Sequence, residues 1–217
     1  YFKMNTLNEL PKEIPVFPLS NFIIFPDTTV PLNIFEPRYI QMVDDCMKSN
    51  RVMGMIQPKK TGNLKKPDLY NVGCIGKITS FNETEDGRYL IVLNGISRFK
   101  IVNEVSTNKL YRICKVNYEN FLSDLNPKKE SLNFSSLETI FKDLKDFFDK
   151  KGYMINWSEL KNQDLGYTIN TLSMASPFSL EEKQTLLESL NINEGKSKLE
   201  KILKTYILDE FGNRTIQ

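Results

Sequence analysis

The chain has 217 residues, of which 40% are hydrophobic and 26% are charged, and it contains no histidine. Its 29 Lys and Arg residues against 27 Asp and Glu residues give a net charge of +2. This composition is typical of a globular protein and excludes a largely disordered or fibrous chain. Without histidine the chain cannot build a Ser-His-Asp or Cys-His catalytic set, a histidine-ligated metal site or a histidine pH switch.

The cysteines and the longest apolar run bear on where the protein works. Cys46, Cys74 and Cys114 are widely spaced and form no C-x-x-C pair, so we expect buried free thiols in a reducing cytoplasm. The longest apolar run, Tyr89 to Leu93, is far shorter than the roughly 20 residues of a membrane span. The N-terminus lacks the apolar segment of a signal peptide. We therefore expect a cytoplasmic protein that contacts no membrane and needs no cofactor or metal.

The chain up to about residue 118 is predicted to consist of strands and one helix. The apolar segment Ile14–Leu19 contains prolines, which cannot donate to a ladder, so we expect it at a sheet edge or bulge. A helix is expected to begin at Pro37, because apolar residues follow it at helical spacing. Asp86-Gly87 predicts a hairpin and Asn94-Gly95 a second turn. Further strands are predicted over 22–25, 30–35, 52–57, 72–81, 89–93, 96–105 and 111–118, with a polar loop over 58–71.

After a polar segment at 121–133 the hydrophobic period becomes helical. The strongest stripe runs from Leu137 to Phe148, preceded by a capping box at Ser135 and Glu138. Further helices are predicted over 164–176, from a capping box at Ser179 to about residue 190, and over 199–212. A β-rich part followed by helices is an α+β fold, with a β-rich subdomain over 1–118 and a helical bundle over 119–217.

The motifs that could carry chemistry have simpler structural explanations. Gly195-Lys196-Ser197 would need a glycine where Leu190 stands to form a phosphate-binding loop, so we interpret it as a helix cap. Neighbouring carboxylates such as Asp44 and Asp45 are explained better by a solvated helix face, where pKa values are ordinary. Nothing in the sequence indicates catalysis, and we expect the protein not to be an enzyme.

Two other groups of residues could bind a ligand. Lysines at positions 59, 60, 65 and 66 could attract nucleic acid, but aromatic residues are not interleaved with them, so a solvated loop is expected. Aromatic residues at helical spacing usually belong to a core, although they could also line a binding groove. These residues are Phe121, Phe134, Phe147, Phe148 and Trp157.

Several short segments form a pattern that extends over roughly residues 14 to 207. They are Val16-Phe17-Pro18-Leu19, Pro31-Leu32-Asn33-Ile34-Phe35-Glu36-Pro37-Arg38-Tyr39, Val72-Gly73-Cys74-Ile75-Gly76, Gly95-Ile96-Ser97-Arg98-Phe99, and the helical stretch 180–188. In this order the chain resembles the N-terminal substrate-recognition domain of Lon proteases. The resemblance implies a PUA-like β pseudobarrel followed by a helical bundle, and a role in recognising unfolded or tagged protein segments.

A full Lon protease adds an ATPase with a phosphate-binding loop and a Ser-Lys proteolytic domain, and neither motif occurs in these 217 residues. The resemblance therefore implies a stand-alone form that lacks both. Its candidate peptide-binding residues are Phe35, Glu36, Arg38 and Tyr39. Tyr39 is expected to bury its ring, and Glu36 and Arg38 to satisfy helix-end groups and each other. The planar guanidinium of Arg38 is also suited to capturing carboxylate or backbone oxygens.

Three functions remain open at this point. The first is a non-enzymatic module that captures extended or unfolded polypeptide in a groove or at a sheet edge, as an adaptor for a separate protease or chaperone. The prolines of residues 14–19 favour edge capture, because they leave a strand only partly paired. The second is a PUA-like nucleic-acid or nucleotide-binding protein, against which the weak net charge argues. An enzyme using carboxylate or Ser-Lys chemistry ranks last.

Overall fold

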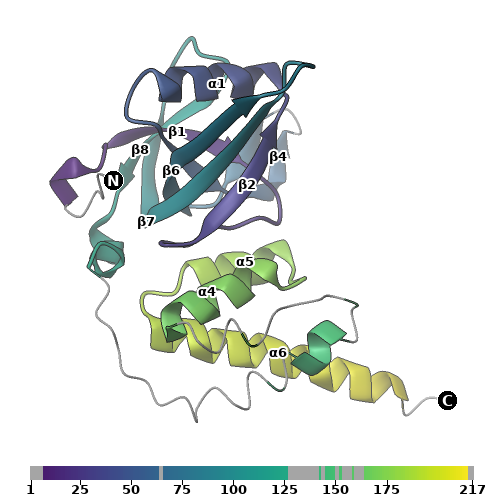
Figure 1. Ribbon diagram of the computed structural model, residues 1–217. Coiled ribbons are helices and arrows are strands. Elements are labelled where there is room, and N and C mark those ends of the chain that lie inside the picture. Colours follow the sequence, from purple (N-terminus) through teal and green to yellow (C-terminus); the bar gives the residue numbers. More distant parts are fainter. Residues whose placement is uncertain are drawn as a thin grey trace. The chain divides into compact units, whose positions relative to one another are not determined.

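The computed structural model describes residues 7–63, 66–126, 142, 145–149, 152, 158 and 164–214. Contacts within the chain divide it into two compact units, residues 1–127 and 128–217. The described part of the first unit contains a six-stranded and a two-stranded β-sheet, one α-helix and two short 3-10 helices, η1 (Leu7–Glu9) and η2 (Glu119–Asp124). The described part of the second unit is helical (Figure 1). The predicted α+β class is confirmed.

Five strands of the main sheet close into a barrel, and a sixth lies beside it. The strand order is β2-β7-β6-β3-β1-β8, and an additional pairing joins β7 to β8. The ring therefore runs β7-β6-β3-β1-β8 and back to β7, while β2 has β7 as its single partner among the described strands. The strands are β1 (Glu13–Pro18), β2 (Thr29–Ile34), β3 (Val52–Ile56), β6 (Val72–Glu83), β7 (Tyr89–Val105) and β8 (Arg112–Asn117).

Strand β1 is one of the five strands that form the barrel, with β3 on one side and β8 on the other, so its predicted place at a sheet edge is wrong. It pairs with β3 in parallel from Val16 to Pro18 and with β8 in antiparallel from Glu13 to Val16. Pro15 thus falls only in the β8 ladder and Pro18 only in the β3 ladder. The two ladders are short and offset, so each proline lies in only one of them. The strand can therefore pair on both sides although it contains two prolines.

Strand β7 is continuous through Asn94-Gly95, where the sequence predicts a turn. The glycine serves a different purpose: a Cβ at Gly95 would collide with the Phe25 carbonyl oxygen. The amide of Asp27 donates to the Gly95 carbonyl at 3.0 Å, and the Gly95 amide donates to the Thr28 carbonyl at 2.8 Å. Gly95 therefore lets another backbone segment approach β7, next to a bulge in its pairing with β6.

Two further segments differ from the sequence prediction. Residues 22–25 form no strand, because Phe25-Pro26-Asp27 turns the chain, and the Thr28 hydroxyl donates to the Phe25 carbonyl at 2.7 Å. The predicted loop 58–71 contains a hairpin, β4 (Pro58–Asn63) and β5 (Lys66–Leu69). Arg112 holds this hairpin by donating to the Pro67 carbonyl at 2.7 Å. The second contact joins residues 45 positions apart, so it has no local sequence signal.

Helix α1 (Pro37–Met47) begins at the predicted proline. It buries Tyr39, Met42, Val43 and Cys46. The predicted apolar face was Tyr39, Ile40, Val43, Cys46 and Met47, of which Ile40 and Met47 are only partly buried. Figure 1 shows this helix across one end of the barrel. The turn from β2 into α1 contains the candidate residues Phe35 and Glu36.

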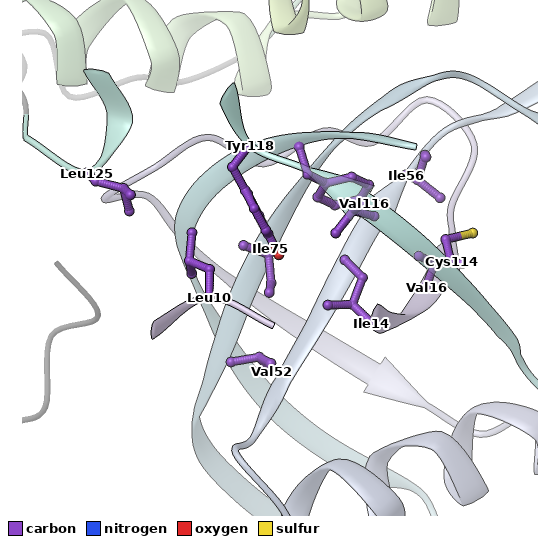
Figure 2. Packing of buried hydrophobic residues seen from close by; sticks show 11 residues of the cluster. Leu10, Ile14, Val16, Val52, Ile56, Ile75, Cys114, Val116, Tyr118 and Leu125 are labelled. Carbon is purple, nitrogen blue, oxygen red and sulfur yellow. The ribbon is translucent and has the colours of Figure 1, made fainter. Parts of the chain in front are cut away.

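The barrel core is built around Phe99, which is fully buried. A Cβ at Gly54 would lie 2.9 Å from Phe99 Cε1, and one at Gly73 would lie 2.6 Å from Phe99 Cζ. Glycines on β3 and β6 therefore leave the space that the phenyl ring of β7 occupies. Figure 2 shows ten other members of this core: Leu10, Ile14, Val16, Val52, Ile56, Ile75, Cys114, Val116, Tyr118 and Leu125.

The described helices of the second unit are α4 (Leu165–Ala175), α5 (Leu180–Leu187) and α6 (Ile192–Arg214). Asp164 caps α4 by accepting from the Tyr167 amide at 2.9 Å, and Ser179 with Glu182 forms the predicted capping box of α5. Gly195 lies within α6, so its interpretation as a cap is wrong; the Asn191 side chain accepts from the Glu194 amide instead.

Aromatic residues pack together in this second unit. Phe147 stacks against Phe178 with ring centroids 6.1 Å apart and lies 5.1 Å from Tyr206, and Phe148 is fully buried. Most of the predicted helical stripe 137–148, together with Phe134 and Trp157, lies outside the described residues. Among the helices that the structure describes, none is long and apolar enough to cross a membrane.

Candidate functional site

The candidate residues Phe35 to Tyr39 connect β2 to α1. Phe35 follows the last residue of β2 and is 65% exposed, although it is a large apolar side chain. Glu36 occupies the N-cap position of α1 but makes no side-chain capping bond, contrary to one part of the expectation. Its carboxylate instead accepts from Arg38 Nε at 2.9 Å and pairs with Arg38 Nη2 at 2.7 Å. The predicted mutual contact of Glu36 and Arg38 is present.

Tyr39 lies beneath this surface pair. Its ring is buried, as expected, and meets Phe17 edge to face with centroids 4.4 Å apart. The Arg38 guanidinium carbon lies 4.5 Å from the centre of the Tyr39 ring. Burial raises the pKa of the Tyr39 hydroxyl, Arg38 lowers it and Glu36 raises it, and burial prevails. Tyr39 is therefore a neutral support that holds the guanidinium in place by a cation–π contact.

The surface next to Phe35 is formed by outward-facing residues of β2 and β7. Along β2 exposed and buried residues alternate, so that Thr29, Pro31 and Asn33 face outward. Asn33 lies opposite Leu90 of β7, which is 43% exposed. We define the β2–β7 outer face as Pro31, Asn33, Phe35, Leu90 and Val92. It combines apolar side chains with one amide and no charge.

Leu90 was missed by the sequence analysis, which placed it in an apolar run. Its outward orientation depends on how β7 pairs with β2 and β6, because a shift of one residue would turn it inward. The neighbouring Tyr89 does face inward and donates from its hydroxyl to Asp44 Oδ1 at 3.0 Å. In the sequence, alternation of apolar and polar residues would have indicated which side chains of β7 face outward. Residues 89–93 are all apolar, so this signal is absent there.

A small cavity of about 190 Å³ lies elsewhere in the first unit, between α1 and β1. Asp45 on its wall accepts from Lys109 Nζ at 2.9 Å and from the Tyr111 hydroxyl at 2.8 Å, and these bonds lower the pKa of its carboxyl. Burial raises the pKa of the adjacent Cys46 thiol to about 12. A thiol with that pKa stays protonated at neutral pH, so this cavity holds no activated nucleophile.

Other chemistry-bearing groups are used within the fold. The lysine-rich segment contributes Lys66, which pairs with Glu104 at 2.9 Å, and Lys59, which lies 5.8 Å from the centre of the Tyr70 ring. Burial raises the pKa of the Cys114 thiol to about 11. Among the described residues, no three or more Cys, Asp or Glu side chains gather closely enough to hold a metal ion.

Comparison with known proteins identifies relatives of the whole fold. Residues 13–205 match the family model of the ATP-dependent protease La (LON) substrate-binding domain. Lon protease of Syntrophus aciditrophicus is 27% identical over 203 residues, which are 88% of this chain and 25% of the relative. Lon protease of Parabacteroides distasonis is 28% identical over 183 residues, which are 80% of this chain and 21% of the relative. The chain thus spans about a quarter of the length of these relatives.

Two solved structures have the same fold at 19% sequence identity. One is a Lon N-terminal domain protein from Xanthomonas campestris, with a TM-score of 0.63 and coverage of 88% of this chain and 97% of that one. The other is the N-terminal domain of Lon protease from the Mycobacterium avium complex, with a TM-score of 0.61 and coverage of 91% and 99%. The resemblance drawn from the sequence is confirmed, and the chain belongs to the family of Lon substrate-binding domains.

Proposed function

We propose that this chain binds extended or unfolded polypeptide through the exposed segment Phe35, Glu36 and Arg38, with Tyr39 supporting it from below. The observation that carries the proposal is membership of a substrate-binding family together with a 65% exposed phenylalanine at that segment. A large apolar side chain held on a folded framework is the kind of anchor that dominates binding energy at interfaces. In this proposal the chain catalyses no reaction itself.

The chemistry of Arg38 suits a polypeptide backbone. Glu36 contacts Nε and Nη2, and within the described part of the chain Nη1 has no hydrogen-bonding partner. The ion pair and the Tyr39 ring fix the plane of the guanidinium, so little side-chain entropy is lost when Nη1 donates to a carbonyl oxygen. Because the Glu36–Arg38 pair is neutral overall, affinity should depend on apolar contact more than on charge.

We further propose that the protein acts in the cell as an adaptor. Bound polypeptide would be presented to a separate protease or chaperone in the cytoplasm. The three cysteines agree with a reducing compartment, since all are buried and none forms a disulfide.

A titration with one protein in two forms tests the proposal. Reduced, carboxymethylated α-lactalbumin is permanently unfolded, and native α-lactalbumin is its folded counterpart. We expect a Kd on the order of 1 μM, or about -8 kcal/mol, for the unfolded form and much weaker binding of the folded one. The affinity should change little between low and high salt. Equal or absent binding of the two forms would contradict the proposal, and tight, salt-sensitive binding of RNA would support the nucleic-acid alternative.

Matched alanine variants locate the surface. Phe35→Ala should raise the Kd for unfolded α-lactalbumin about tenfold, or ~1.4 kcal/mol, because it removes the exposed anchor. Val102→Ala is the control, since Val102 is a similarly exposed apolar residue, 59% accessible, in the part of β7 that pairs with β8. If both variants bound as tightly as the original protein, the site would lie elsewhere.

A further inference from the structure

The barrel leaves the backbone of β2 open on one side. Each of the five ring strands pairs on both sides, whereas β2 pairs with β7 alone. Figure 1 shows β2 running beside β7. Among the described residues, no hydrogen bond joins the backbone of Thr29, Pro31 or Asn33 to any segment other than β7. An open strand edge is a template for pairing with another chain.

The phase of the ladder shows which groups face the open side. The Gly95 amide donates to the Thr28 carbonyl at 2.8 Å, and the β2–β7 register continues without a shift from Thr29 opposite Asn94 to Ile34 opposite Tyr89. Bonded pairs alternate along an antiparallel ladder, so Val30, Leu32 and Ile34 direct their backbone groups toward β7. Those of Thr29, Pro31 and Asn33 therefore point away from β7, where the missing N–H of Pro31 interrupts no existing bond.

We propose that an extended polypeptide pairs with this open edge of β2 as an added strand, and that its outward apolar side chains pack on the β2–β7 outer face. This inference rests on the proposed function and extends its binding site from the segment at Phe35 to the backbone of β2. The occupant would accept from the Thr29 and Asn33 amides and donate to the carbonyls of Thr29, Pro31 and Asn33. Apolar residues at alternate positions would then lie beside Phe35 and Leu90, which are 65% and 43% exposed.

Pro31 favours a foreign polypeptide over a second copy of this chain. When two β2 strands pair antiparallel about Pro31, the middle one of the three residues that face the open side, Pro31 faces Pro31, and neither supplies an N–H to the other. A foreign strand with an ordinary residue at that position still donates to the Pro31 carbonyl, so it loses only one bond of the ladder. Proline on an edge strand is a common device against self-association.

The decisive variants differ in a single backbone donor. Asn33→Ala removes the side chain and keeps the amide, whereas Asn33→Pro removes both, and proline is tolerated at an edge position whose N–H faces outward. Asn33→Ala is the reference variant, because it shares the loss of the side chain with Asn33→Pro and keeps the backbone donor. Asn33→Pro should bind unfolded, carboxymethylated α-lactalbumin about three- to tenfold more weakly than Asn33→Ala, with an unchanged circular dichroism spectrum.

Amide hydrogen exchange of the original protein tests the same edge without a substitution. The amides of Thr29 and Asn33 should exchange rapidly in the free protein and slowly when unfolded α-lactalbumin is bound. Those of Val30 and Leu32, already directed at β7, should be protected in both states. This measurement decides the question even if Asn33→Pro does not fold.

The outcomes separate this inference from the function on which it rests. If the protein binds unfolded α-lactalbumin but the two Asn33 variants bind equally and the edge amides stay unprotected, the edge is not the site and the proposed function stands. If the protein does not bind at all, both are wrong. A dimer in sedimentation that Asn33→Pro dissociates would assign the edge to a second copy and overturn the inference.

Discussion

Arg98 and Asp124 form a bidentate ion pair that is almost completely shielded from solvent. Arg98 Nη2 lies 2.7 Å from Asp124 Oδ1 and Arg98 Nε lies 2.9 Å from Oδ2, with side chains 8% and 7% exposed. The Arg98 amide also donates to Oδ2 at 2.9 Å, and the guanidinium carbon lies 4.5 Å from the centre of the Phe121 ring. The pair attaches helix η2 to β7.

Asp124→Asn should lower the free energy of unfolding by ~3–5 kcal/mol, because it removes the negative charge that balances the buried Arg98 guanidinium. Urea denaturation followed by circular dichroism measures the change. The control is Asp86→Asn, which breaks a solvent-exposed pair between Asp86 and Arg88 at the hairpin tip and should leave the denaturation midpoint unchanged. Similar midpoints for both variants would show that the buried pair contributes nothing.

Asp45 should make stability depend on acid pH. Hydrogen bonds from Lys109 and then Tyr111 hold the pKa of its carboxyl below the ordinary value. Its contribution is therefore complete above the unfolded-state pKa of about 3.9 and is lost as pH falls through the lower, folded-state pKa. Asp45→Asn should lower the urea midpoint equally at pH 7 and pH 5, and the difference from the original protein should disappear in stronger acid. A difference that persisted there would show that the carboxylate charge is not responsible.

Two Gly→Ala substitutions should change stability in opposite directions. A Cβ at Gly73 would lie 2.6 Å from Phe99 Cζ, so Gly73→Ala should overpack the barrel and cost ~1–3 kcal/mol. A Cβ at Gly195 in α6 would lie 3.7 Å from the Ser189 Cβ, which is an ordinary contact. Gly195→Ala should therefore stabilise the protein by ~0.5–1 kcal/mol through helix propensity. Thermal and urea denaturation of both variants measure the contrast, and a tolerated Gly73→Ala would mean that both the Phe99 ring and the Met55 carbonyl oxygen, which a Cβ at Gly73 would also meet, can move aside.

Phe148→Ala should cost ~3–5 kcal/mol, because the side chain is fully buried and its removal leaves a cavity. The matched apolar control in the same unit is Leu190→Ala, at a residue that is 52% exposed, and its effect should stay within ~0.5 kcal/mol. Denaturation monitored by fluorescence and by circular dichroism would show whether the two units unfold together. A loss of less than ~1 kcal/mol for Phe148→Ala would contradict the packing.

The parts of the fold that sequence predicts best are those set by local chemistry. The start of α5 is one case, because Ser179 and Glu182 cap each other within a single turn. Gly95 is the opposite case. Only glycine fits there, because a Cβ would collide with the backbone of Phe25, seventy positions earlier in the chain. The hairpin of β4 and β5 was also missed because a distant residue stabilises it: Arg112 of β8 donates to the Pro67 carbonyl.

The candidate site divides in the same way. The Glu36–Arg38 contact was predictable, because two residues that flank a helical proline lie close together in any helix start. The exposure of Leu90 and the open side of β2 were not predictable. Both depend on which strands become neighbours. The prolines of β1 suggested an open edge there, whereas the strand with one paired side among those described is β2, which contains Pro31.

The position of β1 also limits when the barrel can form during synthesis. Glu13 of β1 pairs with Lys115 of β8, so β1 cannot complete its pairing until β8 has been synthesised. On the ribosome, residues 13–18 remain without one of their two neighbours until residue 117 has left the exit tunnel. Such long-range pairing slows folding and prolongs the exposure of an apolar strand, so the nascent chain is itself a polypeptide of the kind that chaperones hold.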